Sequence, residues 1–272
     1  MREGLDKMNL ARRHFFQVVS ALAGAAVLTA VSGQAQAQYK GNSNGNSNAN
    51  GHGGGRCMLL GTRVLTSRGA ERIENLSIGD CVTTSRGEAK PIKWIGRRRF
   101  AQGPTSQWPG SVHPVRVARS ALADNVPHTD LYLSPMHALF IDGVLIPVKD
   151  LVNGTSIAQA IPEGMTDIEY FHIELETHEV ILAEGAPVET LLVTDEYGRE
   201  NFSNFVEYER RYGRDAGPVM VPYAPVVGYF GGRDHLKALL RLGVSPVVDV
   251  RDHIQVAYDR IAARATSLCL AE

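Results

Sequence analysis

The chain contains 272 residues, of which 44% are hydrophobic and 21% are charged. These fractions are close to the averages for globular proteins, so they exclude a chain that is disordered throughout. The formal net charge of -1 indicates no strongly basic surface, whereas a protein that binds nucleic acid through its phosphates carries more positive charge. The three cysteines cannot all pair within one chain, which excludes a disulfide scaffold. We expect one large all-β domain or about two domains, and no nucleic-acid partner.

The first 37 residues have the pattern of an export signal. Arg12 and Arg13 precede an apolar run at 18–31, which ends near the small-residue sequence AQA at 35–37. A charged region, an apolar region and such a cleavage site are together typical of secretory signals. The paired arginines resemble the twin-arginine type, with a general secretory signal as the alternative. We therefore expect residues 1–37 to be removed, a periplasmic or extracellular location, and no stable membrane insertion afterwards.

Residues 38–56 predict a flexible linker. From 41 to 55 the chain reads GNSNGNSNANGHGGG, which offers too little apolar surface to offset the entropy of ordering it. His52 is a lone histidine in this tract, and we expect it to be inert rather than a metal ligand.

Short apolar runs separated by turn residues extend from 57 to about 200, as in an all-β domain. Asp142-Gly143 lies between the apolar runs 138–141 and 144–148, which strongly indicates a hairpin. Apolar and polar residues alternate over 171–176, which predicts a half-buried strand.

Helical patterns appear only in a C-terminal appendage at 201–272. Leucines at 236, 239, 240 and 242 predict a helix over 234–242 that is ended by Gly243. Asp252 is placed to cap a second helix. The apolar face of that helix comprises Ile254, Ala257, Ile261 and Ala265. The charged runs at 97–99 and 207–211 predict solvated surface.

Three blocks of sequence follow one another within the strand-rich region. The first reads CMLLGT at 57–62 and continues with IENLSIGDCV at 73–82. The second reads LSPMHALF at 133–140, and the third comprises HIEL at 172–175 and THEVILAEG at 177–185. Each block is short enough to occur by chance, but all three in this order, with a cysteine directly after the linker, are specific.

Together these blocks resemble the Hint domain, the module shared by inteins and hedgehog autoprocessing regions. The resemblance covers roughly residues 57–195. It implies an all-β, Hint-type fold of short strands for 57–200, with 201–272 as a small mixed segment that contains two helices.

The resemblance also implies a reaction. Cys57 acts as the nucleophile on the carbonyl of its own preceding residue, Arg56, and an intramolecular attack gains rate from orientation. This N–S acyl shift gives a thioester, through which the Arg56–Cys57 bond is cleaved. His137 matches the family's general acid for the leaving amine, and Ser134 supplies a hydroxyl where the family usually has threonine. The implied partners are the chain's own N-terminal peptide and an unknown acceptor nucleophile.

Two further histidines, His172 and His178, match the closing blocks, although inteins typically carry aspartate at the first of these positions. No His-Asn followed by Ser, Thr or Cys occurs near Glu189-Thr190, and inteins use that asparagine to cut their downstream junction. The resemblance therefore implies cleavage without splicing. The implied catalytic residues are Cys57, Ser134, His137, His172 and His178.

Two other functions stay open at this point. One is a non-catalytic, exported Hint-fold module for surface attachment or interaction. The other is a cysteine hydrolase that acts on other molecules through Cys57 and His137, with Asp142 or Glu174 orienting the imidazole.

Three structural alternatives also stay open. Cys57 and Cys81 could form a disulfide in an oxidising compartment. The Ser-x-x-His motif could be a buried, hydrogen-bonded histidine of the core. His172 and His178 could be metal ligands, but they lack a third partner, so we expect neither a metal nor a cofactor.

Overall fold

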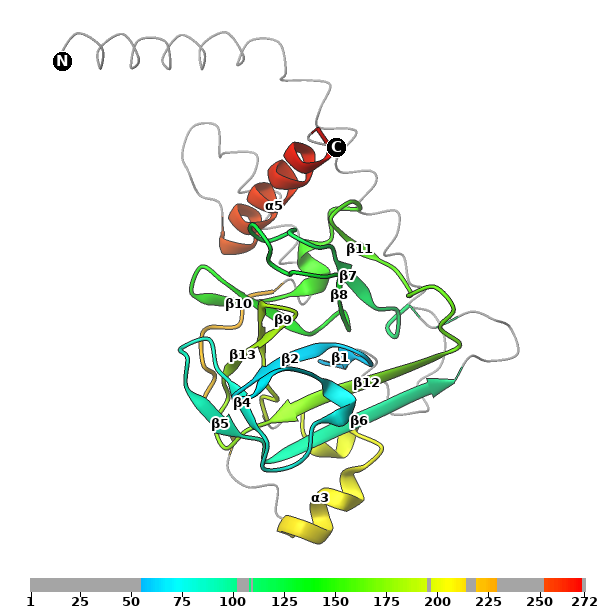
Figure 1. Ribbon diagram of the computed structural model, residues 1–272, viewed down its shortest axis with the longest axis vertical. Coiled ribbons are helices and arrows are strands. Elements are labelled where there is room, and N and C mark those ends of the chain that lie inside the picture. Colours follow the sequence, from blue (N-terminus) through cyan, green and yellow to red (C-terminus); the bar gives the residue numbers. More distant parts are fainter. Residues whose placement is uncertain are drawn as a thin grey trace, which may run out of the picture. The chain divides into compact units, whose positions relative to one another are not determined.

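The computed structural model describes residues 55–101, 108, 110–194, 197–213, 219–228 and 252–270. The predicted export signal, most of the predicted linker and the predicted helix at 234–242 lie outside these residues. The described part consists mainly of two antiparallel sheets (Figure 1), which confirms the all-β prediction for the central region.

The first sheet has six strands in the order β11-β7-β8-β1-β12-β6. Its strands are β1 (Met58–Leu59), β6 (Trp94–Ala101), β7 (Val115–Val117), β8 (Leu131–Leu133), β11 (Ile157–Gln159) and β12 (Asp167–Glu174). The longest pairing joins β6 to β12, from Trp94 opposite Glu174 to Ala101 opposite Asp167. The two-residue strand β1 lies between β8 and β12, with Met58 opposite both Leu133 and Phe171.

The second sheet has eight strands, in the order β10-β9-β14-β13-β2-β4-β5 with β3 paired to β2. They are β2 (Arg63–Thr66), β3 (Gly69–Arg72), β4 (Cys81–Thr83), β5 (Ala89–Pro91), β9 (Ala138–Ile141), β10 (Val144–Pro147), β13 (Val180–Ala183) and β14 (Ala186–Glu189). Three short 3-10 helices connect elements: η1 (Ile73–Asn75), η2 (Val148–Leu151) and η3 (Arg199–Asn201).

The hairpin predicted at Asp142-Gly143 is confirmed. The two residues have φ angles of 50° and 85°, and they connect β9 to β10, in which Val144 pairs with Ile141. A turn with positive φ at both central residues matches the right-handed twist of the flanking strands, and Asp-Gly is one of the pairs that favour it.

The strand predicted at 171–176 forms as the end of β12, but it is buried on both faces rather than on one. Phe171 and Ile173 belong to the main hydrophobic core. On the opposite face, His172 and Glu174 are both 0% exposed, because that face lies under a second hydrophobic cluster that includes Cys57, Trp94 and Phe202. The polar face of this strand therefore points into an interior site.

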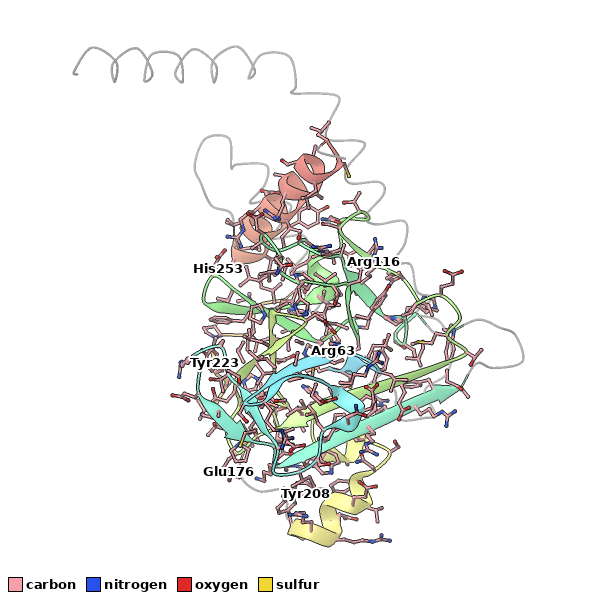
Figure 2. The ribbon with its side chains drawn as sticks, viewed as in Figure 1. Arg63, Arg116, Glu176, Tyr208, Tyr223 and His253 are labelled. Carbon is pink, nitrogen blue, oxygen red and sulfur yellow. The ribbon has the colours of Figure 1, made fainter. Side chains whose placement is uncertain are left out.

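The charged run at 207–211 was predicted to be solvated, and this is wrong for Tyr208. The run lies in α3 (Phe205–Tyr212), which carries Tyr208 (Figure 2). The side chain of Tyr208 is only 3% exposed. Its ring lies 5.5 Å from the ring of Trp94 in an edge-to-face arrangement. Trp94 is more than a hundred residues away in sequence, so the local charge pattern did not reveal this apolar partner.

The second predicted helix is confirmed as α5 (His253–Cys269). The Asp252 side chain accepts a hydrogen bond from the backbone nitrogen of Gln255, which caps the first turn. The buried residues of this helix are Ile254, Ala257, Ile261 and Ala265, as the spacing predicted. Arg260 reaches Asp142 in the β9–β10 turn at 2.9 Å, which attaches the helix to the β-domain. Within the described ranges, no helix has the length and apolar character to cross a membrane.

Candidate active site

The sheet order brings the first two sequence blocks together. Cys57 directly precedes β1, and Ser134 directly follows the neighbouring strand β8. The backbone nitrogen of Ser134 donates to the Cys57 carbonyl oxygen at 2.9 Å. In return, the backbone nitrogen of Cys57 donates to the Ser134 hydroxyl at 2.7 Å. That hydroxyl donates in turn to the carbonyl oxygen of Gly55, so one side chain holds both peptide groups that flank Arg56.

Arg56 itself is held by Tyr197. The backbone nitrogen of Arg56 donates to the Tyr197 hydroxyl at 3.3 Å. The guanidinium carbon of the same residue lies 5.5 Å from the centre of the Tyr197 ring. The sequence reasoning missed Tyr197, because it lies beyond the three blocks and 141 positions from its partner.

The thiol of Cys57 is fully buried. Burial raises its pKa to about 12, although the positive charge of Arg98 opposes the shift and the negative charge of Glu189 adds to it. The resting residue is therefore a protonated thiol at neutral pH. A cavity of about 30 Å³ beside it is lined in part by Gly55, Arg98 and Ser134, which is enough space to hold a water molecule.

His137 and His172 lie together in the interior. Both are 0% exposed, and their ring centres are 5.1 Å apart. Among the described residues, no ring nitrogen of either has a hydrogen-bond partner. Burial lowers the pKa of His137 to about 4, opposed by the negative charge of Glu189 and by an interaction with the backbone of Arg56. Burial also lowers the pKa of His172 well below its ordinary value, so both rings are neutral at neutral pH.

Glu189, at the end of β14, is the charged centre of this cluster. Its side chain is 1% exposed. One carboxylate oxygen accepts a hydrogen bond from the backbone nitrogen of Ala138 at 2.9 Å, next to His137. Burial acts to raise the pKa of Glu189, but the neighbouring His178 ring and the positive charge of Arg56 are among the influences that outweigh burial and lower it. The residue is therefore ionised in the interior.

His178 completes the cluster from the opposite side. The backbone nitrogen of Tyr223 donates to its Nδ1 at 2.9 Å, so a neutral ring carries its proton on Nε2. That nitrogen lies 3.6 Å from a carboxylate oxygen of Glu189. His178 thus contacts Glu189, and Glu189 in turn contacts the segment that carries His137.

The sequence contains a local signal for a role of Glu189 beyond the three blocks. The residue stands in the run VETLLV at 188–193, in which Thr190 is the only other polar residue, and a carboxylate in such a run is rarely buried without a partner.

The two carboxylates suggested as orienting groups for a hydrolase are engaged elsewhere. Asp142 pairs with Arg260 on α5. Glu174 makes a bidentate pair with Arg199, with both N–O distances 2.6 Å. The structure therefore assigns neither of them to the imidazole of His137.

The disulfide alternative and the metal alternative are not supported either. Cys57 and Cys81 are both free thiols in the structure. In the part of the chain that the structure describes, no group of three His, Cys, Asp or Glu residues is arranged to hold a metal ion.

Comparison with known proteins identifies the family of the central region. A family model described as the Hint domain matches residues 56–195. The crystal structure of MchDnaB-1 intein is 12% identical, and the alignment covers 48% of this chain and 98% of that chain with a TM-score of 0.36. The solution structure of a bacterial intein-like domain from Clostridium thermocellum is 15% identical, with coverage of 50% and 98% and a TM-score of 0.34. None of the curated proteins compared with the chain matches it significantly. Because the family model matches more than half of its length, the chain belongs to the Hint domain family.

Proposed function

We propose that this Hint domain cleaves its own chain at the Arg56–Cys57 bond through an N–S acyl shift at Cys57, without splicing. The observation that carries the proposal is the hydrogen bond from the backbone nitrogen of Cys57 to the Ser134 hydroxyl at 2.7 Å. That nitrogen is the leaving group of the shift, and the nucleophilic thiol belongs to the same residue.

The arrangement supports attack because the reacting groups are held before the reaction starts. Ser134 contacts the peptide groups on both sides of Arg56, and β1 fixes the backbone that follows Cys57. Because the reacting groups are already held in place, less entropy is lost when they react, which lowers the barrier. The site also excludes bulk water, since Cys57, His137 and His172 are all 0% exposed.

The proton balance of the shift can be met by neutral groups. As the Cys57 sulfur forms a bond to the Arg56 carbonyl carbon, its proton passes to a ring nitrogen of His137. The bond from that carbon to the Cys57 nitrogen then breaks, and His137 returns the proton to the nitrogen. The products are a thioester at Cys57 and a free amine, with His137 neutral again. A neutral histidine suits this double role because it has both a lone pair and an exchangeable proton.

Release of the peptide that ends at Arg56 requires an acceptor for the thioester. Water gives a free carboxylate at Arg56 and regenerates the thiol, and an added thiol gives a new thioester by exchange. The released segment includes the linker and the predicted export signal. As part of the proposal, export precedes cleavage, because the reverse order would separate the signal from the domain.

The burial of the thiol also bears on the two alternative functions. A hydrolase that acts on other molecules needs an opening through which a substrate reaches the nucleophile, and within the described residues the cavity beside Cys57 is about 30 Å³. A non-catalytic interaction module does not require Arg56, Ser134 and His137 to converge on one peptide bond. We therefore rank both below self-cleavage.

Intact-mass spectrometry of the purified full-length chain tests the proposal. We expect a product that begins at Cys57, formed faster when dithiothreitol is present to attack the thioester. The C57A and H137A variants should stay intact. C81A is the matched control, because it removes another free cysteine and should cleave at the wild-type rate.

Two results would contradict self-cleavage. An unchanged mass of the wild-type chain in thiol favours the interaction module. Turnover of an added peptide or ester by a chain of unchanged mass favours the hydrolase.

A further inference from the structure

The residue before the cleaved bond carries a charge that is partly removed from water. The Nη1 nitrogen of Arg56 is buried, and it has no hydrogen-bond partner among the described residues. Burying part of a guanidinium is costly unless nearby groups compensate for the lost water. The groups around the Arg56 guanidinium therefore indicate which kind of side chain the site accepts at position 56.

Tyr197 contacts both the backbone and the side chain of Arg56. Its hydroxyl accepts from the Arg56 backbone nitrogen at 3.3 Å, and its ring faces the guanidinium at 5.5 Å. A guanidinium within about 6 Å of an aromatic centre is attracted by the negative face of the ring. Tyr197 is itself 8% exposed, and its ring packs against Phe202 at 6.2 Å, so this contact surface is pre-formed.

The charge of Arg56 also complements the interior cluster. It lowers the pKa of the Glu189 carboxyl, which means that cation and carboxylate stabilise each other. Burial is the main reason that the pKa values of His137 and His172 are lowered, and the charge of Arg56 adds to this effect, which favours neutral rings before the shift. A neutral or acidic side chain at position 56 would supply neither effect.

We propose that this domain is selective for a cationic residue immediately before the bond it cleaves, and that Tyr197 is the residue that recognises it. The inference rests on the proposed self-cleavage and specifies its substrate. Tyr197 acts here as a specificity-determining residue, since it contacts the acyl side of the bond and takes no part in proton transfer. After cleavage, the recognised side chain departs with the released peptide.

Cleavage rates of full-length variants at position 56 test the selectivity. We expect R56K to cleave within about threefold of wild type, and R56M to be slower by about tenfold, as the loss of one cation–π contact would give. R56E should be slower still, because its charge opposes Glu189. R68M is the matched control, because Arg68 has a side chain that is 77% exposed, and its rate should not change.

A double-variant comparison assigns the recognition to Tyr197. We expect Y197L to slow the wild-type chain at least as much as R56M does, because it removes the ring that faces the guanidinium and also the hydroxyl that holds the Arg56 backbone. Adding Y197L to R56M should cause a smaller loss than Y197L causes in the wild-type chain, as for two groups in contact. The cleavage rate of Y197F should lie between those of the wild-type chain and Y197L, because Y197F retains the ring and loses the hydroxyl. Y212L, in the more exposed Tyr212 of α3, is the matched control.

The contact can also be measured without cleavage. In the C57A background, urea unfolding of R56M, Y197L and the combined variant should give losses of stability that are less than additive. Additive losses would overturn the contact, and equal cleavage by wild type, R56M and R56E would overturn the selectivity alone. A wild-type chain that never cleaves would instead overturn the proposed function, and the selectivity with it.

Discussion

The Ser134 hydroxyl accepts a hydrogen bond from the backbone nitrogen of Cys57 at 2.7 Å. Seventy-seven positions separate the two residues in sequence, and the pairing of β1 with β8 brings them together. In the proposed reaction this nitrogen changes from an amide into an amine. The hydroxyl is therefore placed to fix the peptide before attack and to stay with the nitrogen as it leaves.

Removal of this hydroxyl should slow cleavage while leaving the fold intact. We expect S134A to cleave about 10²-fold more slowly, in line with the loss of one pre-positioned hydrogen-bonding group. S134T retains a hydroxyl and should keep most of the rate. Time courses by intact mass measure both, and an S134A rate equal to wild type would remove Ser134 from the mechanism.

The pH dependence of cleavage follows from two neutral reactants. The pKa of His137 is about 4 and that of Cys57 is about 12, so both groups are neutral across the intermediate range. We expect a rate that is nearly constant from about pH 6 to about pH 9 and falls toward pH 4 as His137 takes up a proton. A rate that halves near pH 6.5 would show that the reacting histidine is solvated rather than buried.

Glu189 should influence the pH at which the cleavage rate declines on the acidic side. Its negative charge raises the pKa of His137 against the effect of burial. In E189Q the pKa of His137 should drop further, so the fall in rate should move to lower pH. E179Q is the matched control, because Glu179 is also a buried carboxylate, but it pairs with Lys90. Cleavage rates of both variants over the same pH range measure this effect. If the rate of E189Q declines at the same pH as that of the wild-type chain, Glu189 has a structural role only.

Burial of the histidines should also make the fold sensitive to acid. A histidine in the unfolded chain titrates near 6.5, whereas His137 in the folded chain titrates at about 4. The unfolded state binds more protons between these values, so the free energy of unfolding falls as the pH is lowered through them. His137 accounts for about 3 kcal/mol of that fall, and His172 acts in the same direction.

Urea unfolding of the non-cleaving C57A chain at several pH values measures this effect. Adding H137Q should reduce the loss of stability between neutral and acidic pH. H253Q, at an exposed position of α5, should not. An equal loss in both would show that other groups cause the acid sensitivity.

The buried ion pair of Glu174 and Arg199 should be a major stabilising contact. Their side chains are 0% and 2% exposed, so removing Arg199 leaves a buried carboxylate with the more distant cation of Lys93, whose Nζ lies 3.6 Å away. We expect R199M to lower the free energy of unfolding by about 3–5 kcal/mol. R99M is the matched control, because Arg99 pairs with Asp167 where the side chains are 66% and 38% exposed, and it should cost less than about 1 kcal/mol. Urea midpoints in the C57A background compare the two, and equal losses would contradict the role of burial.

The sequence by itself determined the elements whose causes are local. The Asp142-Gly143 turn follows from two adjacent residues that adopt positive φ. Helix α5 follows from a capping residue and an apolar face repeated at helical spacing. The ordered motifs around Cys57, Ser134 and His137 indicated the family, because each motif is contiguous in the chain.

Only the tertiary structure decided which groups surround the scissile bond. Glu189 reaches the backbone beside His137 across 51 positions, and Tyr197 reaches Arg56 across 141. Tyr208 is buried because Trp94 lies beside it, although its neighbours in sequence are charged. These contacts depend on strand order and on which face of a strand is covered. A local pattern of residues specifies neither the strand order nor the covered face, because both arise only when distant segments pack against one another.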